Sequence, residues 1–203
     1  MRFVFLVSVL SLTLGGAAHA SDPGLPPLGR LHFSVALARM AMQHRTFETD
    51  DTGLFFNAAG YGRLRGDWYA GGEIGVGGNV ALFGLDETTT VPIELNLKRG
   101  FGLSRHVALA LGGGLCTSWV EYRDNGFFGT GDERTASDWV FGGQVFGEIL
   151  LHAGWAQTGL QVEYQLTTDA GEVMDLISPG EGWDYSNLKI ALHVGILVPS
   201  RGG

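Results

Sequence analysis

Apolar residues alternate with small or polar residues along most of the chain, and the clearest stretch runs from Arg105 to Tyr122. Odd-numbered positions from 107 to 119 carry mostly large apolar side chains, whereas even-numbered positions carry mainly Ala, Gly, Cys and Ser. A period of two predicts a β-strand, because successive side chains point to opposite faces. A long apolar face opposite a small, nearly uncharged face predicts a strand that crosses a membrane within a β-barrel.

Eight stretches of this kind predict eight strands, each near or above the roughly 9–11 residues that a tilted membrane-spanning strand needs. The predicted strands are Leu31–Arg45, Leu54–Leu64, Trp68–Phe83, Val91–Gly102, Arg105–Tyr122, Asp138–His152, Trp155–Thr168 and Asn187–Val198. In the first strand the apolar face changes side, which predicts a β-bulge near Leu37 or a different register. The pattern as a whole predicts an all-β protein, an eight-stranded antiparallel up-and-down transmembrane β-barrel.

The connections between the predicted strands alternate between short and long. Tight turns are expected at 65–67, 103–104 and 153–154, and longer polar loops at 46–53, 84–90, 124–137 and 169–186. Short turns on one side and long loops on the other are typical of outer-membrane barrels, whose short turns face the periplasm. The predicted long loops are rich in acidic residues, among them Glu48, Asp50, Asp51, Asp86, Glu87 and Asp124.

Nearly every charge within the predicted strands lies on the face opposite the apolar one. The predicted polar network of the lumen consists of Arg39, Arg63, Glu73, Glu94, Lys98, Glu148, Glu163, Lys189 and His193, with amides that include Asn96, Gln144, Gln161 and Gln165. An eight-stranded barrel is just wide enough to be filled by side chains. These groups are therefore expected to pair with one another rather than to line an ion or proton path.

Aromatic residues cluster at the ends of the predicted strands. The expected members of two interfacial girdles are Trp68, Tyr69, Phe101, Trp119, Trp139 and Trp155. Tryptophan and tyrosine are enriched at both membrane–water interfaces, which favours this placement over simple packing in a core.

The first 20 residues have the pattern of a cleaved signal peptide, with Arg2, an apolar stretch over 3–14 and Ala18-His19-Ala20. The expected organisation is a signal peptide at 1–20, a periplasmic lead-in at 21–30, the barrel at 31–198 and a short tail at 199–203. Without residues 1–20, which hold one arginine, the 13 basic residues become 12 against 21 acidic ones. A net charge of 12 − 21 = −9 argues against a nucleic-acid partner. Cys116 is the single cysteine, so no internal disulfide is expected.

The strand pattern, the charged lumen and the glycine-rich stretches GGEIGVGGNV (71–80) and LALGGGL (109–115) resemble the small eight-stranded outer-membrane barrels of the OmpA, OmpX and OmpW type. The resemblance is architectural and covers residues 31–198. It implies residence in the outer membrane of a Gram-negative-type envelope, insertion by the barrel assembly machinery, and contact with outer-membrane lipid and lipopolysaccharide. A monomer without a cofactor is expected.

Three functions are open from the sequence. The leading one is a non-enzymatic, porin-like barrel that serves envelope integrity, adhesion or small-solute passage. The second is a lipid A-modifying acyl hydrolase, for which His32-Phe33-Ser34 is the only His-x-Ser pair after the signal peptide, and a weak signal. The third is a soluble periplasmic lipocalin-like barrel, which would need its apolar faces inside. No catalytic residues and no metal ligands are expected, because the histidines lack metal-ligand spacing.

Overall fold

The computed structural model describes residues 31–43, 48–80, 86–124, 134–168 and 186–196. The predicted signal peptide, lead-in and tail therefore lie outside the described residues, as does Val198. Side chains are described from residue 53 onward, with the exception of four residues at strand ends (79, 80, 86 and 124). In this part of the chain, no helix is long and apolar enough to cross a membrane.

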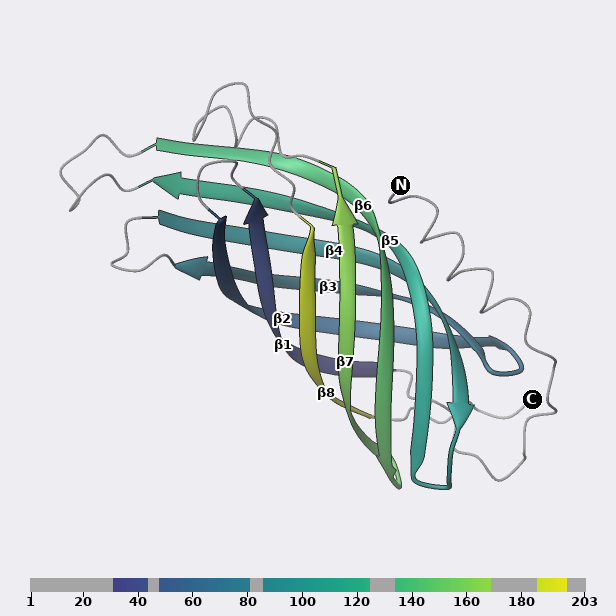
Figure 1. Cartoon of the computed structure of the whole chain (residues 1–203). Coiled ribbons are helices and arrows are strands. Elements are labelled where there is room, and N and C mark those ends of the chain that lie inside the picture. The colour runs from purple at the N-terminus through teal and green to yellow at the C-terminus, as the bar shows by residue number, and fades with distance from the viewer. Residues whose placement is uncertain (1–30, 44–47, 81–85, 125–133, 169–185, 197–203) are drawn as a thin grey trace.

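Eight strands close into one antiparallel barrel in the order of the sequence (Figure 1). The strands are β1 (Leu31–Gln43), β2 (Glu48–Arg65), β3 (Trp68–Val80), β4 (Asp86–Gly102), β5 (Val107–Asp124), β6 (Arg134–Ala153), β7 (Ala156–Thr167) and β8 (Asn187–Ile196). The last strand pairs with the first from Leu31 opposite Ile196 to Met40 opposite Asn187. The predicted up-and-down barrel is confirmed.

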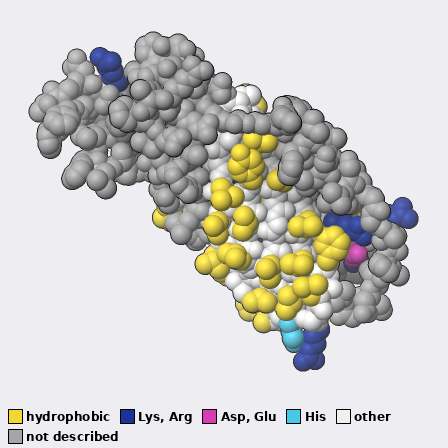
Figure 2. Space-filling view, in the orientation of Figure 1, with side chains coloured by type: hydrophobic (Ala, Val, Ile, Leu, Met, Phe, Trp, Pro, Cys, Tyr) yellow, Lys and Arg dark blue, Asp and Glu magenta, His cyan; other side chains and the backbone are white. Residues whose placement is uncertain are grey.

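The barrel has polar side chains inside and apolar side chains outside, the reverse of a water-soluble protein. In β8 the pattern is strict: Lys189 and Ala191 are buried, and Ile190 and Leu192 are exposed. Figure 2 shows apolar side chains gathered on the barrel wall. The exposed apolar belt includes Leu54, Phe56, Ile74, Val76, Ile93, Leu95, Leu97, Leu111, Leu115, Ile149, Leu151, Leu160, Val162, Leu188, Ile190, Leu192, Val194 and Ile196. Only hydrocarbon solvates such a wall favourably, so the barrel spans a bilayer.

The belt has the height of a bilayer. Along β6 the outward apolar side chains run from Trp139 to Leu151, an advance of 12 residues. At about 3.3 Å per residue and a tilt of about 40°, this stretch rises about 30 Å. The hydrocarbon core of a bilayer is about 30 Å thick. β6 is 20 residues long, so it continues well past the belt at its amino-terminal end.

Three strands begin earlier than predicted. β2, β4 and β6 start at Glu48, Asp86 and Arg134, inside stretches that were expected to be loops. In addition, β5 ends at Asp124, later than the predicted Tyr122, so the acidic residues Glu48, Asp50, Asp51, Asp86, Glu87 and Asp124 lie in strands. The prediction was wrong here because alternation of apolar and polar residues disappears once a strand leaves the membrane, although strand pairing continues.

The bulge predicted near Leu37 is also wrong. Leu37 pairs with Leu54 on one side and Ile190 on the other, and the register continues unbroken in both directions. The register shifts instead in β2, between Arg63 and Arg65, next to a tight turn. The turns at Gly66 and Gly154 have φ values of 56° and 63°, a conformation that glycine adopts without steric cost.

The direction of the faces can be tested at Leu95, whose side chain is 67% exposed near the middle of the belt. Leu95→Arg is expected to lower the free energy of unfolding by about 2–4 kcal/mol, because it places a charge in hydrocarbon. Urea unfolding of the barrel in phospholipid vesicles, followed by tryptophan fluorescence, measures this cost. Thr135→Arg is the control, since Thr135 is exposed beyond the belt. An equal cost at both positions would contradict the assigned belt.

Candidate functional site

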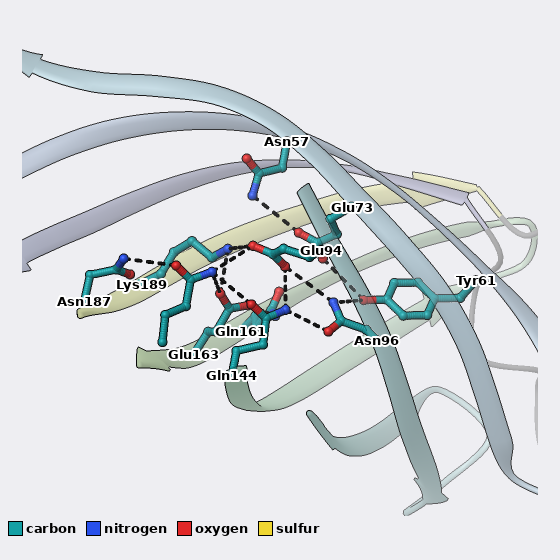
Figure 3. Close-up of polar contacts among 11 residues, drawn as sticks. Asn57, Tyr61, Glu73, Glu94, Asn96, Gln144, Gln161, Glu163, Asn187 and Lys189 are labelled. Carbon is teal, nitrogen blue, oxygen red and sulfur yellow. Dashed lines mark hydrogen bonds and ion pairs between the residues drawn. The ribbon is translucent and has the colours of Figure 1, made fainter. Parts of the chain in front are cut away.

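The lumen is filled by polar side chains that contact one another across the barrel. At its centre the Lys189 ammonium on β8 bridges two carboxylates, with Nζ 2.8 Å from Glu94 Oε1 and 2.7 Å from Glu163 Oε1 (Figure 3). These three side chains are at most 4% exposed. Glu94 comes from β4 and Glu163 from β7, so one cation ties three strands together. Buried charges need partners of this kind because their desolvation is costly.

Glutamine side chains surround the two carboxylates as hydrogen-bond donors. Gln144 Nε2 donates to Glu94 Oε2 at 2.7 Å, and Gln161 Nε2 donates to Glu163 Oε2 at 2.9 Å. Gln165 Nε2 lies between both carboxylates, 2.9 Å from Glu94 Oε1 and 2.8 Å from Glu163 Oε1. Neutral amides thus supply donors where a further cation would otherwise be needed.

A second ion pair lies nearer the short turns. Lys98 Nζ is 2.9 and 3.2 Å from the two carboxylate oxygens of Glu148, and it also lies 3.7 Å from the centroid of the Tyr61 ring. The Tyr61 hydroxyl donates to Glu73 Oε1 at 3.4 Å and accepts from Asn96 Nδ2 at 3.1 Å. Asn96 in turn contacts both Glu94 and Gln144, so the two ion pairs belong to one network.

Below this network, toward the short turns, one side of the lumen is apolar. Ala59, Tyr61, Tyr69, Ala108, Ala110 and Leu150 form a buried cluster. On the neighbouring wall, both ring nitrogens of His152 and the side-chain oxygens of Gln157 and Gln161 are buried without a protein hydrogen bond. Buried polar atoms of this kind are typical binding positions for internal water. A small pocket at the opposite end, lined by Phe55, Thr90, Ser118 and Asn187 among others, lies above Lys189.

Most of the residues predicted for the lumen lie there. Glu73, Glu94, Lys98, Glu148, Glu163, Lys189 and His193 are each at most 4% exposed. Arg63 is a correction: it is exposed, and its Nε donates to the Gly66 carbonyl in the turn. Arg63 pairs with Tyr69, whose side chain lies in the lumen, so Arg63 belongs to the inward-facing row. It is exposed because it lies beside the turn, at the open end of the barrel. Only the backbone of Arg39 is described, opposite Thr52 and Leu188.

The expected girdles need one correction. Three of the expected members are exposed on the outer wall: Phe101 at 36%, Trp139 at 48% and Trp155 at 72%. Trp119 pairs directly with Trp139, and Trp68 is the first residue of β3. Tyr69 is 3% exposed and belongs to the apolar cluster inside the lumen. Trp68 and Tyr69 are adjacent in one strand, so their side chains must point to opposite faces.

Three members of the network were not expected from the sequence: Asn57, Tyr61 and Asn187, whose Nδ2 donates to Gln165 Oε1 at 3.0 Å. Asn57 Nδ2 donates to Glu73 Oε2 at 3.3 Å, and the contacts of Tyr61 join the two ion pairs. Alternation in β2 could have identified Asn57 and Tyr61. Phe55, Asn57, Ala59 and Tyr61 are alternate residues on one face of the strand, and all are buried. Within the part of the chain that the structure covers, no group of three or more His, Cys, Asp or Glu side chains is arranged to hold a metal ion.

No protein-family model matches the chain, and no curated protein matches it. Among solved structures, Neisserial surface protein A (NspA) is similar with a TM-score of 0.59 at 10% identity, covering 83% of this chain and 96% of NspA. Ail, the attachment invasion locus protein of Yersinia pestis, is similar with a TM-score of 0.51 at 12% identity, covering 83% of this chain and 99% of Ail. At these identities the likeness shows the fold alone.

The chain thus has the fold of the small outer-membrane β-barrels. Barrels of this type occur in outer membranes, and the apolar belt of this chain independently requires a bilayer around it. Fold and belt together define a barrel that spans a bilayer, and they reject the soluble lipocalin-like alternative, whose apolar faces would have to point inward.

The central ion pairs can be tested with Lys189→Met. Loss of this cation leaves Glu94 and Glu163 buried beside each other, so the free energy of unfolding is expected to fall by about 3–5 kcal/mol. Urea unfolding in vesicles measures the change, and heat-dependent mobility on SDS gels reports whether the variant still folds.

Arg123→Gln is the matched control for Lys189→Met. Arg123 lies 3.6 Å from Glu121 with a side chain that is 43% exposed. An exposed ion pair contributes at most about 1 kcal/mol, so this variant should unfold close to the wild type. If both variants changed stability by the same small amount, the network would not be the interaction that holds the lumen together.

Proposed function

We propose that this chain is a non-enzymatic outer-membrane barrel that acts at the cell surface as an attachment protein and does not serve as an open pore. The observation that carries the proposal is a lumen filled by buried ion pairs, together with strands that continue past the apolar belt. The first feature argues against solute passage. The second supports a role for the part of the protein that stands in water.

The filled lumen argues against the small-solute passage that the sequence left open. Lys189 on β8 contacts Glu94 on β4, and Lys98 on β4 contacts Glu148 on β6, so side chains from separate walls meet. Ion pairs at 2.7–2.9 Å leave no space between their partners for a hydrated ion. The apolar cluster around Leu150 adds a further layer beneath them.

The strands that leave the membrane support a role outside it. Past the Trp119–Trp139 pair, the outer face of β5 and β6 becomes polar, with Glu121 opposite Ser137 and then Arg123 opposite Thr135. Pairing continues to the last residues of both strands, so a hydrogen-bonded sheet rather than a free loop extends beyond the lipid. A rigid scaffold that presents exposed chain is a common basis for recognition. Ail carries attachment in its name, and for this chain attachment is part of the proposal.

The proposal predicts that the extended hairpin is needed for attachment. Replacement of residues 122–136 by an Asn-Gly turn removes the extension in whole cross-strand pairs, from Tyr122 opposite Ala136 outward. Bacteria that produce this variant are expected to lose most of their binding to epithelial cells or matrix proteins, relative to bacteria with the intact chain. Arg65→Gln, at the opposite end of the barrel, should bind normally.

Proteoliposome swelling in sugar solutions tests the other half of the proposal. The intact barrel is expected to cause no swelling above that of protein-free vesicles. Sugar entry at a rate typical of a porin would reject the sealed lumen. Unchanged attachment of bacteria with the shortened hairpin, with the barrel shown to be folded, would reject the surface role.

A further inference from the structure

The cations at the short-turn end form a group that the proposed function does not use. Four arginines, here called the arginine rim, lie in or next to two of the turns: Arg63, Arg65, Arg99 and Arg105. Among the residues with described side chains at this end, Asp67 is the single acidic one. Figure 2 shows Lys or Arg and His side chains at the tip that lies below the apolar belt. A chain with a net charge of −8 thus has a locally basic end.

The rim is continuous with the lipid-facing girdle. Trp68 pairs with Arg65 on one side and with Arg99 on the other, so the three residues form one row across β2, β3 and β4. The Arg99 guanidinium lies 6.0 Å from the centroid of the Trp68 ring and 5.1 Å from that of Phe101. Aromatic rings of a girdle lie at the level of the lipid headgroups, which therefore also fixes the depth of this guanidinium.

Local hydrogen bonds hold the two turns in place. Gly100 N donates to the Asp67 carbonyl at 2.8 Å, which ties the β2–β3 turn to β4. In the next turn, Arg105 Nε donates to His106 Nε2 at 2.8 Å, and His106 Nδ1 lies 3.2 Å from the His152 carbonyl oxygen. The arginines are therefore carried by an ordered edge of the barrel, and Arg65 and Arg105 are exposed there.

We propose that the arginine rim binds the phosphate groups of anionic phospholipids in the periplasmic leaflet. A guanidinium offers paired N–H donors that match phosphate oxygens, and it stacks on aromatic rings at the same time. Both features are present at Arg99. The partner is an anionic headgroup because the rim is basic and its aromatic neighbours place it at headgroup depth. This inference rests on the membrane-spanning fold and is independent of the proposed attachment role.

Lipid selectivity measured by electron spin resonance tests the proposal. The barrel is reconstituted in phosphatidylcholine, and the fraction of motionally restricted probe is compared for spin-labelled phosphatidylglycerol and spin-labelled phosphatidylcholine. The wild type is expected to prefer phosphatidylglycerol several-fold, and added salt should weaken that preference. The combined variant Arg65→Gln, Arg99→Gln and Arg105→Gln should lose it. Arg63 is left unchanged because its Nε holds the Gly66 carbonyl in the turn.

Two further variants complete the lipid experiment. Arg123→Gln with Arg134→Gln removes the two cations with described side chains at the opposite end, and it should keep the full preference. Arg99→Lys keeps the charge but loses the paired donors, and should retain only part of it. This single change also serves if the triple variant does not fold. A preference that persists in the triple variant, or that falls equally in the opposite-end control, would overturn the proposal.

Inorganic phosphate separates a lipid headgroup from a free anion as the ligand. At equal ionic strength, phosphate buffer and chloride buffer should give the same selectivity, because the headgroups are concentrated at the interface. A specific loss of phosphatidylglycerol preference in phosphate would show that the rim takes free anions, and would also overturn the proposal.

Discussion

A backbone in hydrocarbon must satisfy its N–H and C=O groups within the protein, and the rest of this structure follows from that constraint. An open sheet would leave two edges unpaired, so β1 closes on β8. Closure with eight strands fixes a width that side chains can fill. The wall must then be apolar outside, and whatever polar groups the chain contains must lie inside and satisfy one another. The network of Lys189, Glu94 and Glu163 is the result.

The narrow width also explains why glycine is common on the inner wall. A Cβ atom at Gly112 would lie 2.5 Å from Phe146 Cζ and 2.8 Å from Lys98 Cβ, closer than real Cβ contacts allow. The missing side chain therefore leaves room for the Phe146 ring and for the Lys98 side chain on the neighbouring strands. Glycine-rich stretches entered the sequence analysis only as part of a resemblance, and this position shows one physical role for such a glycine, which is close packing of side chains inside the barrel.

The sequence predicted most where the bilayer imposes a pattern and least where it does not. Hydrocarbon outside and a filled lumen inside force apolar and polar side chains to alternate strictly. The strands, and the faces that Glu94 and Ile190 occupy, could therefore be predicted from this alternation. At the ends of the strands, alternation no longer predicts the face that a residue occupies. Past the belt, water solvates both faces, and the first residues of β6 carry no alternation to read. Next to a tight turn, the shift after Arg63 changes which face a residue occupies, and no pattern in the sequence marks that shift.

The same constraint bears on where lysine and arginine side chains lie in the chain. Both lysines, Lys98 and Lys189, are buried in the lumen, and every other cation is an arginine. An ammonium group is compact and can bridge carboxylates that approach from several strands, as Lys189 does with Glu94 and Glu163. A planar guanidinium suits an interface, where it can stack on Trp68 or Phe101 as Arg99 does. Among the cations with described side chains, the two lysines thus pair with carboxylates inside the barrel, whereas Arg99 stacks on aromatic rings of the outer wall.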